Sequence, residues 1–142
     1  MRALFDVNVL IAAFDEEHVL HEHAQQWWAA NRTHGWASCP LTQNGFVRIV
    51  SQPNYPNPIS VEAALELFAE QIAGTDHAFW PDDISLTDTR CFDGTHILGP
   101  KQLTDVYLLA LAVKNDGRLA TLDHAIPLAA VRGARPGHVV VI

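Results

Sequence analysis

The chain has 142 residues, a length that suits one domain spanning residues 1–142, with enough core to fold without a disulfide or structural metal. Hydrophobic residues make up 49% and charged residues 18%, a globular balance without a stretch approaching the roughly 18 apolar residues of a membrane span. Because the N-terminus also lacks a secretory segment, we expect a cytoplasmic protein with reduced thiols at Cys39 and Cys91.

The formal net charge of −7 argues against nucleic-acid binding through lysine and arginine alone. Such a charge fits better if several acids are gathered around a divalent cation. The cation then supplies the positive charge that a phosphate group meets.

The N-terminal half alternates short apolar strands with helices. Ser60 is a typical N-cap for the last of these helices, and residues at helical spacing give it an apolar stripe. Three prolines between residues 52 and 58 indicate a loop before that helix. The predicted elements are a strand at 2–5, a helix at 7–14 just after Asp6, a helix at 21–31, a strand at 36–39, a helix at 42–51 and a helix at 61–73 with the stripe Leu65, Phe68, Ala69 and Ile72.

The C-terminal half continues the alternation. Thr104 is expected to cap a helix at 105–115, with Gly117 in the position of a C-terminal glycine. Strands are expected at 77–80, 118–122 and 138–142, whereas 86–98 shows no clear pattern. The alternation predicts an α/β domain with a mostly parallel sheet.

Three aspartates occupy strand ends and helix starts. Asp6 follows the first strand, Asp123 follows the strand at 118–122, and Asp105 opens a helix. Such positions converge outside the carboxyl ends of parallel strands. Asp105 can also be explained by the helix dipole, and Asp123 by a turn. Asp6 has apolar residues on both sides in the sequence, so it is expected to lie near the core. A carboxylate buried there requires a partner.

Several carboxylates close together repel one another unless a cation lies between them. Mg²⁺ and Mn²⁺ prefer oxygen ligands, so a few aspartates suffice to bind either ion. The three aspartates are therefore candidate metal ligands.

Together these residues resemble a PIN domain, and specifically a VapC-type toxin of the bacterial VapBC toxin–antitoxin pairs. The more specific parts of the match are Asp6, directly after the first strand, and the Thr-x-Asp sequence formed by Thr121 and Asp123. Four segments carry the resemblance, namely residues 4–10, 39–48, 102–112 and 117–123.

The resemblance implies a compact α/β/α sandwich and a Mg²⁺- or Mn²⁺-dependent endoribonuclease, in which an activated water leaves 5′-phosphate and 3′-hydroxyl ends. Asp6 and Asp105 would be the principal metal ligands, and Asp123 would complete the site. Asn8 and Thr121 would support them by hydrogen bonds.

The chain departs from the family at Gln43. The family usually carries a glutamate at the start of this helix, so the cluster has three formal negative charges rather than four. Gln43 is kept as a catalytic candidate because an amide oxygen can still coordinate a cation. Arg48, on the same helix, is a candidate contact for substrate phosphate or a partner for a surface acid.

The resemblance further implies an RNA substrate, a homodimer and a cognate VapB-type antitoxin, a short protein whose C-terminal segment blocks the acidic cleft. A basic residue such as arginine suits that blocking role. No membrane association is expected.

Other functions remain open from the residues alone. The domain could be a binding module that lost catalysis through Gln43. An α/β phosphatase with Asp6 as nucleophile also fits, although such enzymes commonly carry a second acid where this chain has Asn8.

Other polar and aromatic groups have simpler interpretations. The three histidines fit a solvated helix face better than a metal cluster, and the three tryptophans fit a core or dimer surface better than base stacking. The two C-terminal arginines form either a small basic patch or part of a solvated loop. The residues concerned are His18, His21 and His23, Trp27, Trp28 and Trp36, and Arg132 and Arg135.

Overall fold

The computed structural model describes all 142 residues and contains one five-stranded sheet. Every strand pair is parallel, and the strand order is β3-β2-β1-β4-β5. The α/β class predicted from the sequence is therefore confirmed, with a sheet that is parallel throughout. The strands are β1 (Ala3–Phe5), β2 (Trp36–Ser38), β3 (His77–Phe79), β4 (Arg118–Thr121) and β5 (Val139–Val141).

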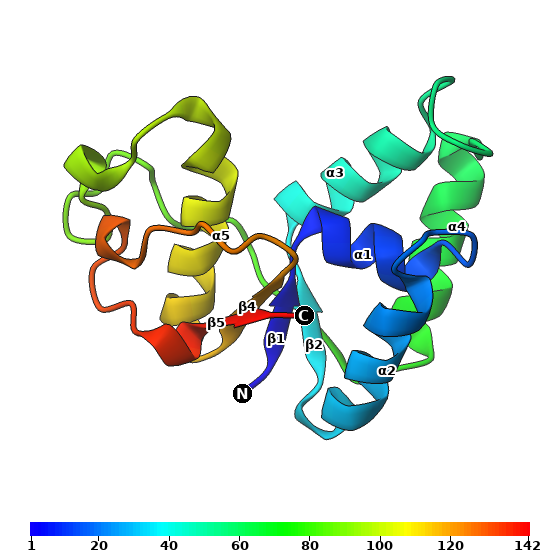
Figure 1. Cartoon of the computed structure of the whole chain (residues 1–142), viewed down its shortest axis with the longest axis horizontal. Coiled ribbons are helices and arrows are strands. Elements are labelled where there is room, and N and C mark those ends of the chain that lie inside the picture. The colour runs from blue at the N-terminus through cyan, green and yellow to red at the C-terminus, as the bar shows by residue number, and fades with distance from the viewer.

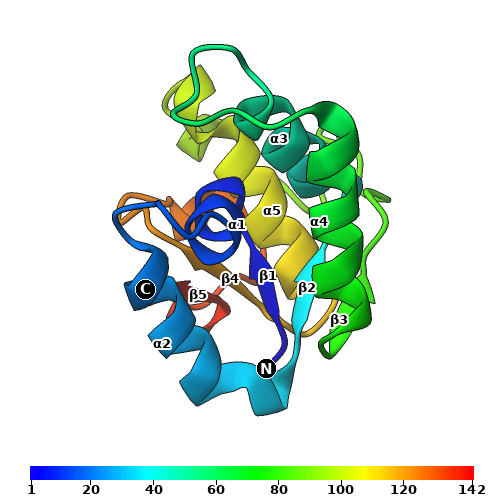
Figure 2. The same cartoon turned by 90° about the vertical axis from the view of Figure 1, so that its right-hand side faces the viewer.

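Helices lie on both faces of the sheet (Figure 1). Helix α5 covers one face, and the helices of the N-terminal half lie on the other, as Figure 2 shows from their side. The α-helices are α1 (Val7–Phe14), α2 (His21–Asn31), α3 (Pro40–Val50), α4 (Val61–Ala73) and α5 (Leu103–Lys114), and the short 3₁₀ turns are Arg32–His34, Gly94–His96, Pro100–Gln102, Leu128–Ala130 and Pro136–His138. None of the helices is long and apolar enough to cross a membrane.

Successive side chains of each strand point to opposite faces of the sheet and contribute to two separate apolar cores. Leu4, Ala37 and Leu119 pack with α5, whereas Phe5 and Trp36 pack with the helices on the other face. Phe5 and Trp36 stack with ring centroids 5.3 Å apart. Trp36 is buried, and the partly buried Trp27 and Trp28 pack edge-on against Phe5 at the border of this core.

Helix α3 begins two residues earlier than predicted. Pro40 occupies the first turn, where a missing N–H costs no helical hydrogen bond. The Cys39 N–H donates to the Thr42 hydroxyl at 3.0 Å, and the Leu41 N–H donates to the Asp82 carboxylate at 3.1 Å. The start predicted at residue 42 is wrong, because a proline that interrupts a strand can also occupy the first turn of the next helix.

The predicted apolar stripe of α4 is partly wrong. Ser60 caps this helix through the Ala63 N–H, as expected. However, Leu65 is 56% exposed, and the fully buried side chains are Ala64 and Phe68. The exposed part of the stripe faces a groove between α3 and α4 of about 690 Å³ rather than the core.

The two ends of α5 also differ from expectation. The helix begins at Leu103 and follows a 3₁₀ turn, so Thr104 is not its N-cap and Asp105 lies within the first turn. At the other end Asp116, not Gly117, takes the left-handed conformation, with φ of 53°. Gly117 is needed for a close approach, since a Cβ there would lie 2.7 Å from the Arg2 carbonyl oxygen.

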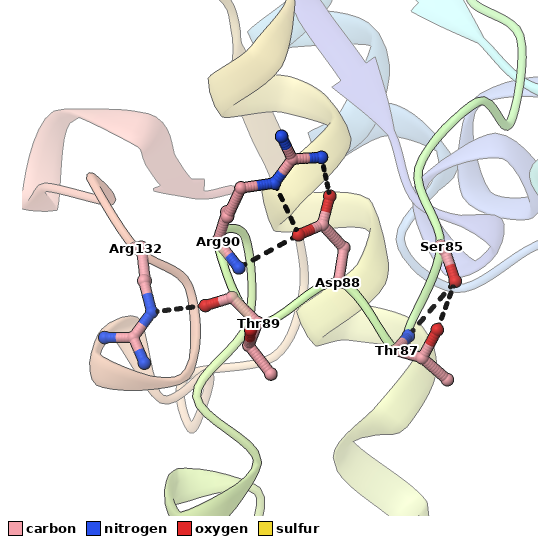
Figure 3. Close-up of polar contacts among 6 residues, drawn as sticks. All are labelled: Ser85, Thr87, Asp88, Thr89, Arg90 and Arg132. Carbon is pink, nitrogen blue, oxygen red and sulfur yellow. Dashed lines mark hydrogen bonds and ion pairs between the residues drawn. The ribbon is translucent and has the colours of Figure 1, made fainter.

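The segment that the sequence left unassigned, 86–98, is held by local polar contacts (Figure 3). The Arg90 guanidinium pairs with the Asp88 carboxylate at 3.0 Å, and Arg132 donates to the Thr89 carbonyl at 2.7 Å. Phe92 also forms a bridge with Val131. Side chains and turns, rather than a periodic pattern, therefore hold this segment against the C-terminal region.

Candidate functional site

The sheet places three acids at one edge because its strand order reverses beside β1. Strands β2 and β3 extend to one side of β1, and β4 and β5 extend to the other. In parallel sheets, ligands bind outside the carboxyl ends of the strands at such a reversal. Asp6 directly follows β1, and Asp123 lies two residues after β4, its neighbour.

Asp6 is only 5% exposed and is held by groups from two elements. As the N-cap of α1 it accepts the Val9 N–H at 2.9 Å. Its other oxygen accepts the hydroxyl hydrogen of Thr121, which is fully buried on β4. Burial raises the pKa of Asp6, whereas the hydrogen bonds from Thr121 and from the Val9 and Asn8 N–H groups oppose the rise.

Thr121 connects Asp6 with Asp123. While its hydroxyl donates to Asp6, it accepts the Asp123 N–H at 3.0 Å. Asp123 in turn accepts the Ala125 N–H at 2.8 Å and lies at the exposed side of the edge. Thr121 therefore fixes the loop that carries Asp123 relative to the carboxylate of Asp6.

Asp105 joins this group from the first turn of α5. Its pKa is raised to about 6, chiefly by burial and additionally by the negative charges of Asp6 and Asp123 and a hydrogen bond to Asp123. This electrostatic coupling indicates that the three carboxylates share one region. A cation between them would remove the repulsion that raises this pKa.

The side chains do not form a closed metal cage. No group of three or more His, Cys, Asp or Glu side chains is close enough together to count as a metal-binding cluster. The donor set still fits a hard cation, because carboxylate oxygens are the preferred ligands of Mg²⁺ and Mn²⁺, which retain several waters. Each Asp6 oxygen that accepts one hydrogen bond also keeps a second lone pair.

The other candidate residues at this end of the sheet make no side-chain hydrogen bond to the three aspartates. Asn8 is exposed in the first turn of α1 and contributes its backbone N–H to Asp6. Gln43 donates from Nε2 to the Ser38 hydroxyl at 3.0 Å, and no hydrogen bond joins it to an aspartate. Both Gln43 and the exposed Arg48 line the groove between α3 and α4.

The histidines and cysteines make other contacts. His21 Nδ1 lies 2.9 Å from the Ala12 carbonyl oxygen, and His18 accepts the Leu20 N–H at 3.0 Å. Both cysteines are free, and burial raises the pKa of the Cys39 thiol to about 11, which makes it a poor nucleophile.

Sequence reasoning missed two polar residues beneath Gln43. Ser38 is fully buried at the end of β2, and its hydroxyl lies 2.8 Å from His77 Nε2 on β3. A polar pair in two otherwise apolar strands is a usable signal, but the sequence alone does not show that the two strands are neighbours.

Comparison with known proteins agrees with the geometry. The PIN domain family model matches residues 3–132. Three relatives from Mycobacterium tuberculosis align over most of both chains: Ribonuclease VapC44 is 51% identical over 138 residues (97% of each chain), Ribonuclease VapC38 is 40% identical over 125 residues (87% of this chain and 86% of the relative), and Ribonuclease VapC39 is 38% identical over 134 residues (94% and 96%). With this coverage, and with an acidic edge at the reversal of a parallel sheet, the chain belongs to the PIN-domain family and to its VapC group.

Proposed function

We propose that the chain is a metal-dependent endoribonuclease that acts as the toxin of a type II toxin–antitoxin pair in the bacterial cytoplasm. The observation that carries the proposal is the coupling of Asp105 to Asp6 and Asp123 at the carboxyl edge of the sheet. The VapC relatives, which are named ribonucleases, support RNA as the substrate. We treat residues 1–142 as a single domain.

We assign Asp6, Asp105 and Asp123 as the residues that would hold Mg²⁺ or Mn²⁺. A divalent cation at this edge would lower the pKa of an attacking water and balance the charge that grows on the phosphate. Asp6 is preorganised for this role because two hydrogen bonds fix its carboxylate. Thr121 holds the Asp123 loop, and the Asn8 N–H supports Asp6.

Gln43 and Arg48 are proposed at the rim of the same site. Gln43 is the polar group that α3 contributes, since this helix contains no acid. Arg48 is exposed and forms no ion pair, which leaves its guanidinium free for a phosphate. Neither residue adds negative charge, so the site relies on three carboxylates.

The test is RNA cleavage by partner-free protein with Mn²⁺ or Mg²⁺, stopped by EDTA. We expect Asp6→Asn to abolish cleavage with little loss of stability, because asparagine also caps helices. Asp93→Asn is the matched control, since Asp93 also caps a short helix through a backbone N–H. Cleavage by Asp6→Asn at the parent rate would refute the assignment.

The same assays distinguish the other two functions. Hydrolysis of small phosphoesters without RNA cleavage would favour a phosphatase, and the absence of both activities would favour a binding module.

The antitoxin would close the acidic edge with a basic residue, because charge-assisted hydrogen bonds to carboxylates are strong. We propose that an apolar helix of the same antitoxin occupies the groove between α3 and α4, where Val61 and Leu65 are more than half exposed. Leu65→Ser, which removes the apolar contact without adding charge to the groove that Arg48 also lines, should then weaken antitoxin binding. Unchanged antitoxin affinity in that variant would contradict the placement.

The protein is further proposed to be a homodimer. Light scattering on the purified chain tests this oligomeric state.

A further inference from the structure

Three polar side chains from three elements form a continuous line beneath α3. Gln43 of α3 donates from Nε2 to the hydroxyl oxygen of Ser38 at 3.0 Å. That hydroxyl lies 2.8 Å from Nε2 of His77 on β3. Ser38 is fully buried between the other two, so solvent does not compete for its hydrogen bonds.

The donor at one end determines the direction of the whole line. A hydroxyl has one hydrogen to give, and the oxygen of Ser38 already accepts from Gln43. The oxygen has a second lone pair and could also accept from His77, but the buried Ser38 hydrogen would then have no acceptor, because Gln43 and His77 are the only hydrogen-bond partners of this hydroxyl. The Ser38 hydrogen is therefore assigned to His77 Nε2, which acts as an unprotonated acceptor. His77 is therefore neutral and carries its hydrogen on Nδ1, the less common tautomer of free histidine.

The surroundings of His77 favour the neutral ring. Burial lowers its pKa, and the positive charge of Arg2 lowers it further against the opposing charge of Asp76. Arg2 is held in place by the Asp76 carboxylate at 3.0 Å and by the Trp36 carbonyl at 3.0 Å. The Trp36 ring, whose centroid lies 4.5 Å from that of His77, fixes the imidazole plane.

We propose that His77 is a positioning residue that acts through Ser38 to set which end of the Gln43 carboxamide is free. The amide nitrogen is bound to Ser38, so the carbonyl oxygen remains available. That oxygen is the only atom of the Gln43 side chain that can bind a cation or accept a hydrogen bond from a ligand. The role in catalysis rests on the proposed function, whereas the direction of the hydrogen bonds does not.

The direction is tested by ¹⁵N NMR of the His77 ring in the full-length protein at pH 7.5, without metal or RNA. The expected result is the Nδ1–H tautomer in the parent. In Gln43→Glu the carboxylate can only accept, so Ser38 must turn towards residue 43 and His77 must donate from Nε2. An Nε2–H ring in the parent, or an unchanged ring in Gln43→Glu, would overturn the proposal.

The positioning role is tested by a double-mutant cycle on RNA cleavage. His77→Phe keeps a ring against Trp36 but removes the acceptor, and we expect it to lower kcat/KM about fivefold, the equivalent of one hydrogen bond. In a Gln43→Ala background the same change should alter kcat/KM less than about twofold. His77→Gln restores an acceptor near the position of Nε2 and should recover activity.

Equal losses from His77→Phe in both backgrounds would refute positioning through Gln43, because a purely structural effect does not depend on residue 43. If none of the variants, nor the parent, cleaves RNA, the proposed function fails. The NMR result then decides the hydrogen-bond direction by itself.

Discussion

Removing the charge of Asp105 is expected to stabilise the metal-free protein while abolishing its activity. In the folded chain this carboxyl group has a pKa of about 6 rather than 3.8, because it is partly buried beside Asp6 and Asp123. At neutral pH the fold therefore carries a charge that its surroundings disfavour. Asp105→Asn removes that charge and keeps the shape of the side chain.

The size of the effect follows from the pKa. A change from 3.8 to about 6 corresponds to about 3 kcal/mol, at about 1.36 kcal/mol for each tenfold change in acidity. Solvent on the exposed side of Asp105 screens the interaction, so we expect about 1–2 kcal/mol. For a chain of this length that is a rise in Tm of about 3–8 °C.

The sign of the pH dependence is also determined. The unfolded chain releases the Asp105 proton near pH 3.8 and the folded chain near pH 6, so between these values the folded state binds more protons. The contribution of Asp105 to stability therefore falls as the pH rises through this window. The advantage of Asp105→Asn should be complete at pH 7.5 and absent below about pH 4.

Thermal unfolding in EDTA at pH 4, 6 and 7.5 measures this difference. Glu66→Gln, which removes an exposed acid on α4, is the control and should change stability by less than about 0.5 kcal/mol. A variant Asp105→Asn no more stable than the parent at pH 7.5, or one whose advantage persists unchanged at pH 4, would refute the electrostatic reasoning.

Three further predictions concern the same edge and its packing. Saturating Mn²⁺ at pH 7.5, about 100 times its Kd, should stabilise the parent by about 2.7 kcal/mol, with no rise in Asp105→Asn; an equal rise in both would place the ion elsewhere. Thr121→Val removes the hydroxyl between Asp6 and the Asp123 N–H, so it should destabilise the fold by about 1–3 kcal/mol and move the acidic limb of the cleavage pH profile upward, because the pKa of Asp6 rises further. Gly117→Ala should cost about 1–3 kcal/mol in a denaturant titration, since its Cβ would lie 2.6 Å from the Trp80 ring, whereas Gly94→Ala meets nothing within 4 Å and should be neutral.

Strong periodicity made most of the fold predictable. The bounds of α1, α2 and α4 agree with the predicted ranges, and each strand lies within its predicted range. The errors lie where local chemistry outweighs a pattern. Pro40 starts a helix because the first turn needs no N–H, and a 3₁₀ turn before α5 displaces Thr104 from the cap.

The acidic site was partly predictable for a different reason. Asp6 stood out because a carboxylate among apolar residues needs partners, and its contacts with Val9 and Thr121 supply them. The hydrogen bonds of Gln43 could not be foreseen, because they depend on β2 and β3 being neighbours. A sequence shows which residues follow a strand, whereas strand order decides which of them meet.

The central position of β1 has a consequence for synthesis on the ribosome. This strand is made before the other four, and its neighbour β4 (Arg118–Thr121) is made more than one hundred residues later. Until then Asp6 lacks Thr121, and neither Asp105 nor Asp123 is in place beside it. The acidic edge therefore cannot assemble until the segment up to Asp123 has been made. Such long-range pairing is slow to form, so any hydrolytic activity appears late relative to the synthesis of β1.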